Sequence, residues 1–272
     1  MKDEPVELVD ALPREMLPLS PSASTRRTSF ASRTLAEQLQ PIVQVHELVR
    51  GEARGHVDVE RARARIAAGR NGFDAAPVIR AAGDLRPAFE RTAAAFESTG
   101  IASTADAAAV REHATDATPL VLAWANSESV PRKPIQRLAR TVASIVGNAV
   151  LARASDDVGK GFSFSAWTRS NCPCCGASPD LALTTKVKRT LVCWRCDTQW
   201  RTTHWGCLGC GADGEPEVAR VASPYLGYEL AICNACGRYL KERRGSLTHE
   251  LIVERTLTAG LDEAAQQRGL RA

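Results

Sequence analysis

The first half of the chain carries apolar residues at helical spacing from about residue 34 to residue 157. Alanine, leucine, arginine and glutamate dominate this region, and they favour helix. Pro41 interrupts the first apolar stretch and is expected to end or kink a helix there. The pattern predicts a bundle-like domain of about four to six helices. The apolar positions that carry it are Leu35, Leu39, Ile42, Val43, Val45 and Leu48, then Leu85, Phe89, Ala93 and Phe96, then TPLVLAWAN, then Ile135, Leu138, Val142, Ile145, Val146 and Ala149.

The pattern changes in the stretch SDDVGKGFSFSAW, where Gly159 and Gly161 mark a break. Every cysteine lies beyond it, between residues 172 and 236, among turn residues and short β-branched stretches. One of these, KVKRTLVCW, is typical of a strand that leads into Cys193. The last stretch, LTHELIVERTLTAGLDEAAQQRGLRA, returns to helical spacing and predicts one or two closing helices.

These shifts predict an α+β protein. A helical N-terminal domain would be followed by two small rubredoxin-like or zinc-ribbon metal modules and a C-terminal helix. The expected segments are a flexible leader at 1–33, a helical domain at 34–160, a first metal module at 161–204, a second metal module at 205–245 and a C-terminal helical segment at 246–272.

Composition narrows the class of protein. The chain has 272 residues and is 44% hydrophobic, which is enough to bury a substantial core. Its 35 basic and 31 acidic side chains leave a formal charge of +4, a small surplus within a mixed surface. A dedicated nucleic-acid-binding protein would show a more concentrated excess of basic side chains, so no nucleic-acid partner is expected.

One stretch, STRRTSF, resembles the start of a twin-arginine export signal through Arg26 and Arg27. The residues that follow, ASRTLAEQLQPI, are polar and supply no apolar core for such a signal. We interpret the two arginines as part of a mobile basic arm. No run of about 18 apolar residues occurs, so no membrane insertion is expected. A cytoplasmic protein with reduced cysteines is therefore the expectation.

Eight of the nine cysteines form C-x-x-C pairs, and Cys174 is left over. Two residues between thiolates let a tight turn aim both sulfurs at one metal ion. Three pairs are followed by glycine, which suits a turn that needs positive φ, whereas Asp197 follows the second pair. The pairs are Cys172 with Cys175, Cys193 with Cys196, Cys207 with Cys210, and Cys233 with Cys236.

Eight thiolates predict two tetrahedral four-cysteine sites, which suit two ions of zinc or iron. Joining the first pair with the second and the third with the fourth encloses loops of 17 and 22 residues, enough for a hairpin each. Interleaved, cross-braced joining stays open but is less favoured. His204 lies three residues before Cys207 and is expected to be a surface or polar-cluster residue rather than a ligand. Cys174 is either a small buried side chain, which we favour, or an exposed thiol.

The order and spacing of four motifs resemble one family. They are WTRSNCPCCGASP, LVCWRCDTQW, CLGCG and CNACGRYLK, and the tail LDEAAQQRGLRA is similar as well. On these residues, from about 165 to 272, the chain resembles the FdhE family of formate dehydrogenase accessory proteins. Asp197 stands where a glycine is usual, and His204 stands where another basic residue is usual.

The resemblance implies a non-enzymatic cytoplasmic protein that serves the maturation of formate dehydrogenase as a chaperone. Its partner would be the catalytic subunit of that enzyme, bound before export through the metal-stabilised C-terminal region. The four cysteine pairs would be the metal ligands. A homodimer stays open. In the motif GRYLK, Tyr239 and Lys241 face either a partner or solvent, and the two interpretations are balanced.

Two other functions stay open from the residues. A zinc-ribbon protein could bind nucleic acid or act as a regulator, and two basic clusters would then contact phosphate. An enzyme is not expected because closed four-cysteine sites keep no open metal position, although an iron-loaded site could exchange electrons. The clusters are Lys186, Lys188 and Arg189, and then Arg238, Lys241, Arg243 and Arg244, with Glu242 interrupting the second.

Overall fold

A computed structural model describes residues 21–53, 57–127, 133–214, 217–223 and 227–271, with the backbone alone described for residues 21–33. The chain forms two compact units that interleave along the sequence. The first, which we call the helical unit, comprises Glu37–Ser178 and Val192–Arg201. The second, which we call the sheet unit, comprises Pro179–Leu191 and Thr202–Ala272 together with the chain up to Ala36.

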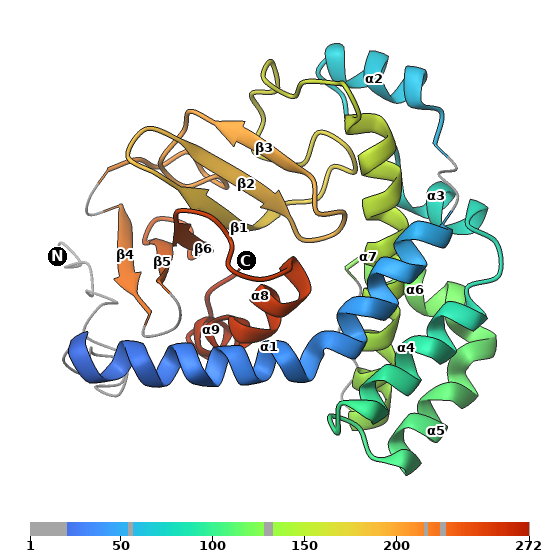
Figure 1. Cartoon of the computed structure of the whole chain (residues 1–272). Helices are drawn as coiled ribbons and strands as arrows, with labels where there is room; N and C mark the ends of the chain where they lie inside the picture. Colours follow the sequence, from blue (N-terminus) through green and yellow to red (C-terminus); the bar gives the residue numbers. More distant parts are fainter. Residues whose placement is uncertain (1–20, 54–56, 128–132, 215–216, 224–226, 272) are drawn as a thin grey trace, which may run out of the picture. The chain divides into compact units, whose positions relative to one another are not determined.

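The helices before the sheet are α1 (Pro21–Glu52), α2 (Val59–Ala67), α3 (Ala75–Ala81), α4 (Arg86–Ser98), α5 (Thr104–Glu112), the 3-10 helix η3 (His113–Asp116), α6 (Ala117–Ala125) and α7 (Pro134–Gly159). The described residues therefore hold seven α-helices here, more than the sequence predicted, because the short segments α2 and α3 are separate helices. Within the helical unit, helices α2 to α6 all pack against α7 (Figure 1).

Helix α7 is the core element of the helical unit. From Val146 to Ala152 every residue is buried, so the helix is enclosed on all sides rather than along one stripe. Gly147 lets α6 approach closely, since a Cβ atom there would lie 2.5 Å from the Trp124 ring. Just before this stretch, Ile145, which was expected on the buried face, is only partly buried, whereas Ala143 is completely buried.

Helix α1 differs from the sequence prediction at its start and at Pro41. Of the two expected effects of Pro41, an end or a kink, the end is excluded because the helix continues through this residue. The helix also begins at Pro21, within the expected leader, because proline suits the first helical position and no other proline separates it from Pro41. Residues 1–20 of the expected leader lie outside the described residues. Leu48 is exposed, whereas His46 and Val49 take the buried positions beside it.

The strands are β1 (Pro179–Thr184), β2 (Arg189–Cys193), β3 (Gln199–Thr202), β4 (Val218–Ala222), β5 (Tyr228–Cys233) and β6 (Tyr239–Arg244), followed by α8 (Leu251–Leu257) and α9 (Ala259–Gln267). Their order is β3-β2-β1-β6-β5-β4. Strand β1 pairs with β6 in parallel, with Leu181 opposite Lys241, whereas the β4–β5 and β5–β6 pairs are antiparallel. The strands of the two predicted modules thus form one sheet.

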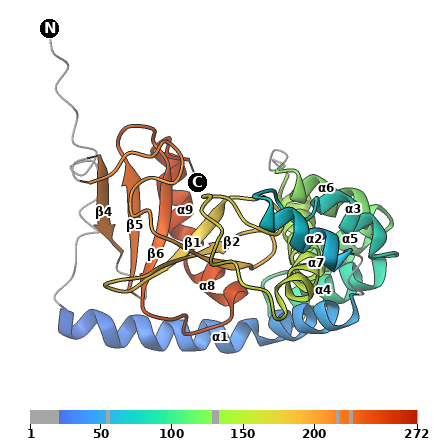
Figure 2. The ribbon, with the colours of Figure 1, turned by 90° about the horizontal axis from the view of Figure 1, so that it is seen from above.

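Within the sheet unit, α8 and α9 are held to one face of the sheet (Figure 2). The Tyr228 hydroxyl donates to Glu254 at 2.8 Å, and the Tyr239 hydroxyl donates to Asp262 at 2.8 Å. Lys241 pairs with Asp262 as well. The buried Lys241 and Glu254 are thus both partnered, which is the condition under which buried charges are tolerated. The predicted class is confirmed: a helical N-terminal region precedes a C-terminal part of the sequence that holds a mixed sheet, two four-cysteine clusters and closing helices.

Candidate metal centres

The eight cysteines in C-x-x-C pairs form two clusters, and none of the nine cysteines, all of which lie in the described residues, forms a disulfide. The first cluster holds Cys172, Cys175, Cys193 and Cys196, and the second holds Cys207, Cys210, Cys233 and Cys236. The pairs therefore join sequentially. Within each cluster all sulfurs lie within 4.8 Å of one another, and each cluster could hold a metal ion.

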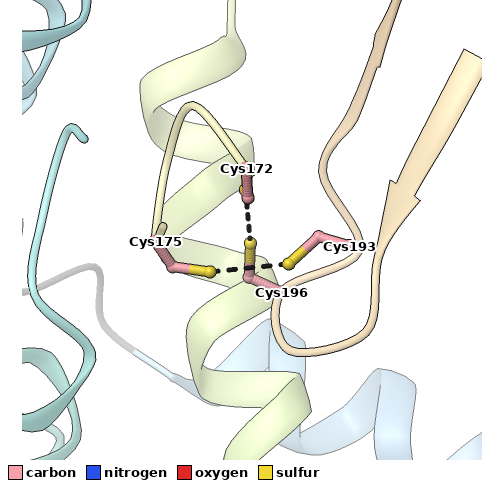
Figure 3. A group of neighbouring side chains, drawn as sticks. All are labelled: Cys172, Cys175, Cys193 and Cys196. Atoms are coloured by element: carbon pink, nitrogen blue, oxygen red, sulfur yellow. Dashed lines mark hydrogen bonds between the residues drawn. The ribbon is translucent and has the colours of Figure 1, made fainter. Parts of the chain in front are cut away.

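The spacing of the sulfurs fits a metal better than a disulfide. In the first cluster the Sγ atoms of Cys172 and Cys196 are 3.6 Å apart, and those of Cys175 and Cys193 are 3.5 Å apart. In the second cluster, Cys207 with Cys236 and Cys210 with Cys233 are likewise 3.5 Å apart. A tetrahedron with metal–sulfur bonds of about 2.3 Å has edges of about 3.8 Å, whereas a disulfide bond is about 2.05 Å long. Figure 3 shows the four sulfurs of the first cluster turned toward a common centre.

All four C-x-x-C turns, which we call knuckles, share one pattern of backbone hydrogen bonds. In the first, the Cys172 amide donates to the Ala177 carbonyl at 2.8 Å, and the Gly176 amide donates to the Cys172 carbonyl at 3.1 Å. The same two bonds recur at Cys193, Cys207 and Cys233. The residue after the second cysteine takes positive φ in each knuckle: Gly176 at 78°, Asp197 at 58°, Gly211 at 81° and Gly237 at 67°. This geometry is why three of the four knuckles carry glycine there.

Asp197 keeps this left-handed position without being glycine. Its carboxylate accepts a hydrogen bond from the Asn148 side-chain amide at 3.0 Å, and Asn148 also donates to the Arg195 carbonyl at 3.3 Å. The Asn148 carbonyl oxygen in turn lies 2.7 Å from His46 Nε2. Aspartate tolerates positive φ better than most residues. The departure from glycine therefore gives the second knuckle a polar anchor on helix α7.

The first knuckle is anchored within the helical unit as well. Asn71 donates to the Cys172 carbonyl at 2.8 Å, and the Gly72 and Phe73 amides donate to the Pro173 and Cys174 carbonyls at 2.9 Å. Cys174 is completely buried in this turn, so it is a packed small side chain and not an exposed thiol. All four cysteines of the first cluster are buried.

Side-chain hydroxyls surround one thiol of the first cluster. Thr198 Oγ1 lies 3.1 Å from Cys196 Sγ, and Ser155 on α7 lines the same small pocket as Cys196. Burial opposes ionisation of Cys196, but hydrogen bonds from the other three cluster cysteines and from Ser155 hold its pKa well below the usual value. Burial and thiol contacts raise the pKa of Cys193 instead.

Two residues beside the first cluster were missed by sequence reasoning. Ser155 lines the same pocket as Cys196, and Asn148 donates to Asp197, but both lie in an ordinary helical pattern on α7. Polar residues at buried positions of an otherwise apolar helix are the signal that could have marked them, since a buried polar group needs a partner.

The second cluster is more open. Cys210 is exposed and Cys236 is half-buried, while Cys207 and Cys233 are buried. Burial raises the pKa of Cys207, but backbone amides of Cys210 and Gly209 and the thiols of Cys236 and Cys233 outweigh burial and lower that pKa to about 7. A Cβ atom at Gly209 would lie 2.4 Å from Arg238 Cδ, so the arginine side chain packs directly against this knuckle.

Three residues of the sheet unit can now be placed. His204 Nε2 lies 3.1 Å from the Cys207 carbonyl oxygen, so His204 is a polar-cluster residue and not a member of the four-sulfur group. Tyr239 and Lys241 are 6% and 3% exposed, and both bind Asp262. The interpretation of these two residues as a partner-facing surface is therefore wrong. Neither is a solvated strand end.

Comparison with known proteins shows that this chain and a solved structure have similar folds. No family model and no curated protein matches the chain. Among solved structures, the FdhE protein from Pseudomonas aeruginosa is similar with a TM-score of 0.61 and 18% sequence identity, over 87% of this chain and 92% of that one. In the part of the chain that the structure describes, no helix is long and apolar enough to span a membrane. The chain with its two four-cysteine clusters thus has the fold of the FdhE protein.

Proposed function

We propose that the protein is a cytoplasmic, non-enzymatic accessory protein that serves the maturation of formate dehydrogenase by binding its catalytic subunit. The observation that carries this proposal is the shared fold over 87% of the chain, in a protein whose knuckle motifs already resemble the FdhE family. Fold alone does not assign a partner. The cysteine clusters supply the second support, because they stabilise the part of the chain in which those motifs lie.

The eight cysteines are proposed as the ligands of two metal ions, zinc or iron. When bound, either ion would cross-link two knuckles and stabilise the surrounding strands, since metal binding free energy becomes folding free energy in such sites. Four thiolates fill a tetrahedron and leave no position for a substrate. The chain's own contribution is to hold the thiolates close, to donate backbone amides to sulfur, as Gly209 does to Cys207 at 3.3 Å, and to exclude water from the first cluster.

The structure weakens the nucleic-acid alternative at particular residues. Arg189, Lys241 and Arg243 are buried and paired with carboxylates instead of lying on a phosphate-binding surface. Three of the seven cations in the two predicted clusters are thereby removed from solvent. The accessory role remains the better supported proposal.

A binding experiment tests the proposal. Metal-loaded protein would be immobilised and presented with the formate dehydrogenase catalytic subunit, and we expect a stable complex. Cys233→Ser should weaken the complex because it opens the second cluster. Cys174→Ser is the matched control, since Cys174 is a thiol outside both clusters. Absence of any complex with the metal-loaded wild-type protein would overturn the proposal.

A further inference from the structure

The sheet unit contains a pocket of about 620 Å³ that neither cysteine cluster uses. Its wall includes Lys186, Trp205, Arg220, Glu229, Glu242 and Arg244, which together we call the cationic groove. This volume lies within the range of pockets that bind ligands, about 300 to 1,000 Å³.

Strand register places the groove on one face of the sheet. Glu229 lies opposite Glu242, and Thr184 lies opposite Arg244, so their side chains share a face. The residues that hold α8 and α9 alternate with them and point to the other face, as Tyr228 and Arg243 do through Glu254. The groove is therefore separate from the side of the sheet that the closing helices cover.

Two arginines fix the floor of the groove. Arg189, which is 1% exposed, pairs with Glu242 at 2.6 Å and donates to the His204 and Gly206 carbonyls at 3.0 Å. Arg220 pairs with the same Glu242 at 3.2 Å and donates to the Trp205 carbonyl at 3.0 Å. Two guanidinium groups thus share one buried carboxylate, and the loop that carries Trp205 is held in place by both.

The rim of the groove carries solvent-accessible positive charge. Arg244 is 79% exposed at its side chain and pairs with Glu229 at 2.7 Å, a contact that an exposed arginine exchanges easily. Lys186 is exposed on the turn between β1 and β2. Three cationic side chains of the groove, Lys186, Arg220 and Arg244, therefore face two carboxylates, an excess of one positive charge, while the buried Arg189 neutralises Glu242 from below.

Apolar surface accompanies this charge. Val187, between Lys186 and Lys188, is 90% exposed, the largest exposed fraction among the large apolar residues that the structure describes. Trp205 is half-buried in the wall of the groove. A cationic pocket with an aromatic wall and an exposed apolar residue beside it suits a protein segment that carries both carboxylates and apolar side chains.

We infer that the cationic groove binds an acidic, carboxylate-rich segment of a partner protein, with Lys186, Arg220 and Arg244 contacting the carboxylates. This inference rests on the proposed function for the partner's identity, which would be the formate dehydrogenase catalytic subunit. A nucleic acid fits the groove less well because its phosphate backbone carries no apolar group to cover Val187, which is 90% exposed beside Lys186.

The test uses full-length, metal-loaded protein and a labelled poly-glutamate peptide, with single-stranded DNA as the second probe. We expect the peptide to bind in a salt-dependent manner, and Lys186→Glu with Arg244→Glu to lower its affinity by about tenfold. Both side chains are exposed, so the double variant should keep its metal content and circular dichroism spectrum. Arg61→Glu, at an exposed arginine on α2, is the control and should bind like the wild type.

Equal peptide affinity in the double variant and the wild type would overturn the inference, and so would tighter binding of DNA than of the peptide. Binding to the catalytic subunit is measured separately with the same proteins. If the wild type and the double variant bind the subunit equally well, the groove is not the binding site for the subunit, while the proposed accessory function stands. If the wild type does not bind the subunit but binds the peptide through these residues, the function is wrong while the acidic-segment site stands.

Discussion

Asn148 on helix α7 donates its side-chain amide to Asp197, 3.0 Å away in the second metal knuckle. The same asparagine lies 2.7 Å from His46 on α1 through its carbonyl oxygen. A buried polar chain therefore runs from helix α1 through α7 to the first cysteine cluster. Such a chain is stabilising only while each member keeps its partner, because an unpaired buried polar group costs about 1–3 kcal/mol.

Substitutions at Asp197 should separate two contributions to the free energy of unfolding: the strain of a positive φ and the hydrogen bond to Asn148. Asp197→Ala loses the carboxylate and keeps a Cβ atom at φ 58°, so we expect a loss of about 2 kcal/mol in the free energy of unfolding. Asp197→Gly loses the same hydrogen bond but removes the strain, and should cost less. Denaturant unfolding of the metal-loaded proteins checks the order. An equal loss of unfolding free energy in the two variants would show that backbone strain at residue 197 does not contribute.

Single cysteine substitutions should empty one cluster at a time. Cys193→Ser and Cys233→Ser should each lower the metal content from two ions to one, because each removes a ligand from a different cluster. The first lies in the helical unit and should lower the thermal stability of the helices, whereas the second should leave most helical signal unchanged. Elemental analysis and circular dichroism measure these effects. Loss of both ions in either variant would contradict independent clusters.

A chelator should remove the metal of the second cluster first. Cys210 is exposed and Cys236 is half-buried, so a chelator can reach that ion, whereas all four cysteines of the first cluster are buried. Release followed with a colorimetric chelator should show a fast and a slow phase. The fast phase should be missing from Cys233→Ser. Its persistence in that variant would assign the labile ion to the first cluster instead.

Close packing around Gly147 predicts a small-to-large effect. Gly147→Ala would place a Cβ atom 2.5 Å from the Trp124 ring, and overpacking of this kind destabilises by about 1–3 kcal/mol. Gly51→Ala is the matched control in helix α1, where a Cβ atom meets nothing within 4 Å. The control should raise stability by about 0.5–1 kcal/mol because alanine favours helix. Thermal unfolding measures the stability of both variants against the wild type. A Gly147→Ala protein as stable as the wild type would refute the prediction.

Alkaline pH should loosen the closing helices. Burial raises the pKa of Tyr228, and the nearby Glu254 carboxylate raises it further; burial and Asp262 raise the pKa of Tyr239. A raised folded-state pKa gives stability that is present below the ordinary tyrosine pKa of about 10 and is lost as the pH rises above it.

The absorbance of ionised tyrosine measures this effect. Tyr228→Phe and Tyr239→Phe assign the signals, and both tyrosines should ionise above the ordinary pKa of about 10 in the folded protein. Glu254→Gln removes the neighbouring charge and should bring the Tyr228 transition to lower pH. Ionisation of Tyr228 and Tyr239 near pH 10, without loss of the fold, would contradict their burial against these carboxylates.

Local spacing in the sequence was enough to predict the clusters. Two residues between cysteines direct both sulfurs toward one point, so the four pairs followed from short-range geometry, and the favoured sequential joining is the one observed. Helical spacing likewise identified the first region, although Pro41 did not act as a helix end. A proline inside a long helix removes one hydrogen bond, and the bonds on either side were sufficient to continue α1.

Long-range pairing could not be predicted in the same way. Strand β6 lies beside β1 through a parallel pairing between segments far apart in the sequence, and nothing local marks that register. For the same reason Lys241 and Arg243 looked like a solvated basic cluster, although Asp262 and Glu254 bind them. Their partners lie on helices that only the folded chain brings to the sheet.

The parallel pairing of β1 with β6 also sets an order of events during synthesis. All ligands of the first cluster have left the ribosome once Cys196 has emerged, but β1 must wait for β6, near the end of the chain, before its pairing is complete. Metal can therefore be captured well before the last strands associate. If the proposed ions bind, a shortage of metal would therefore act on the chain before its sheet is complete.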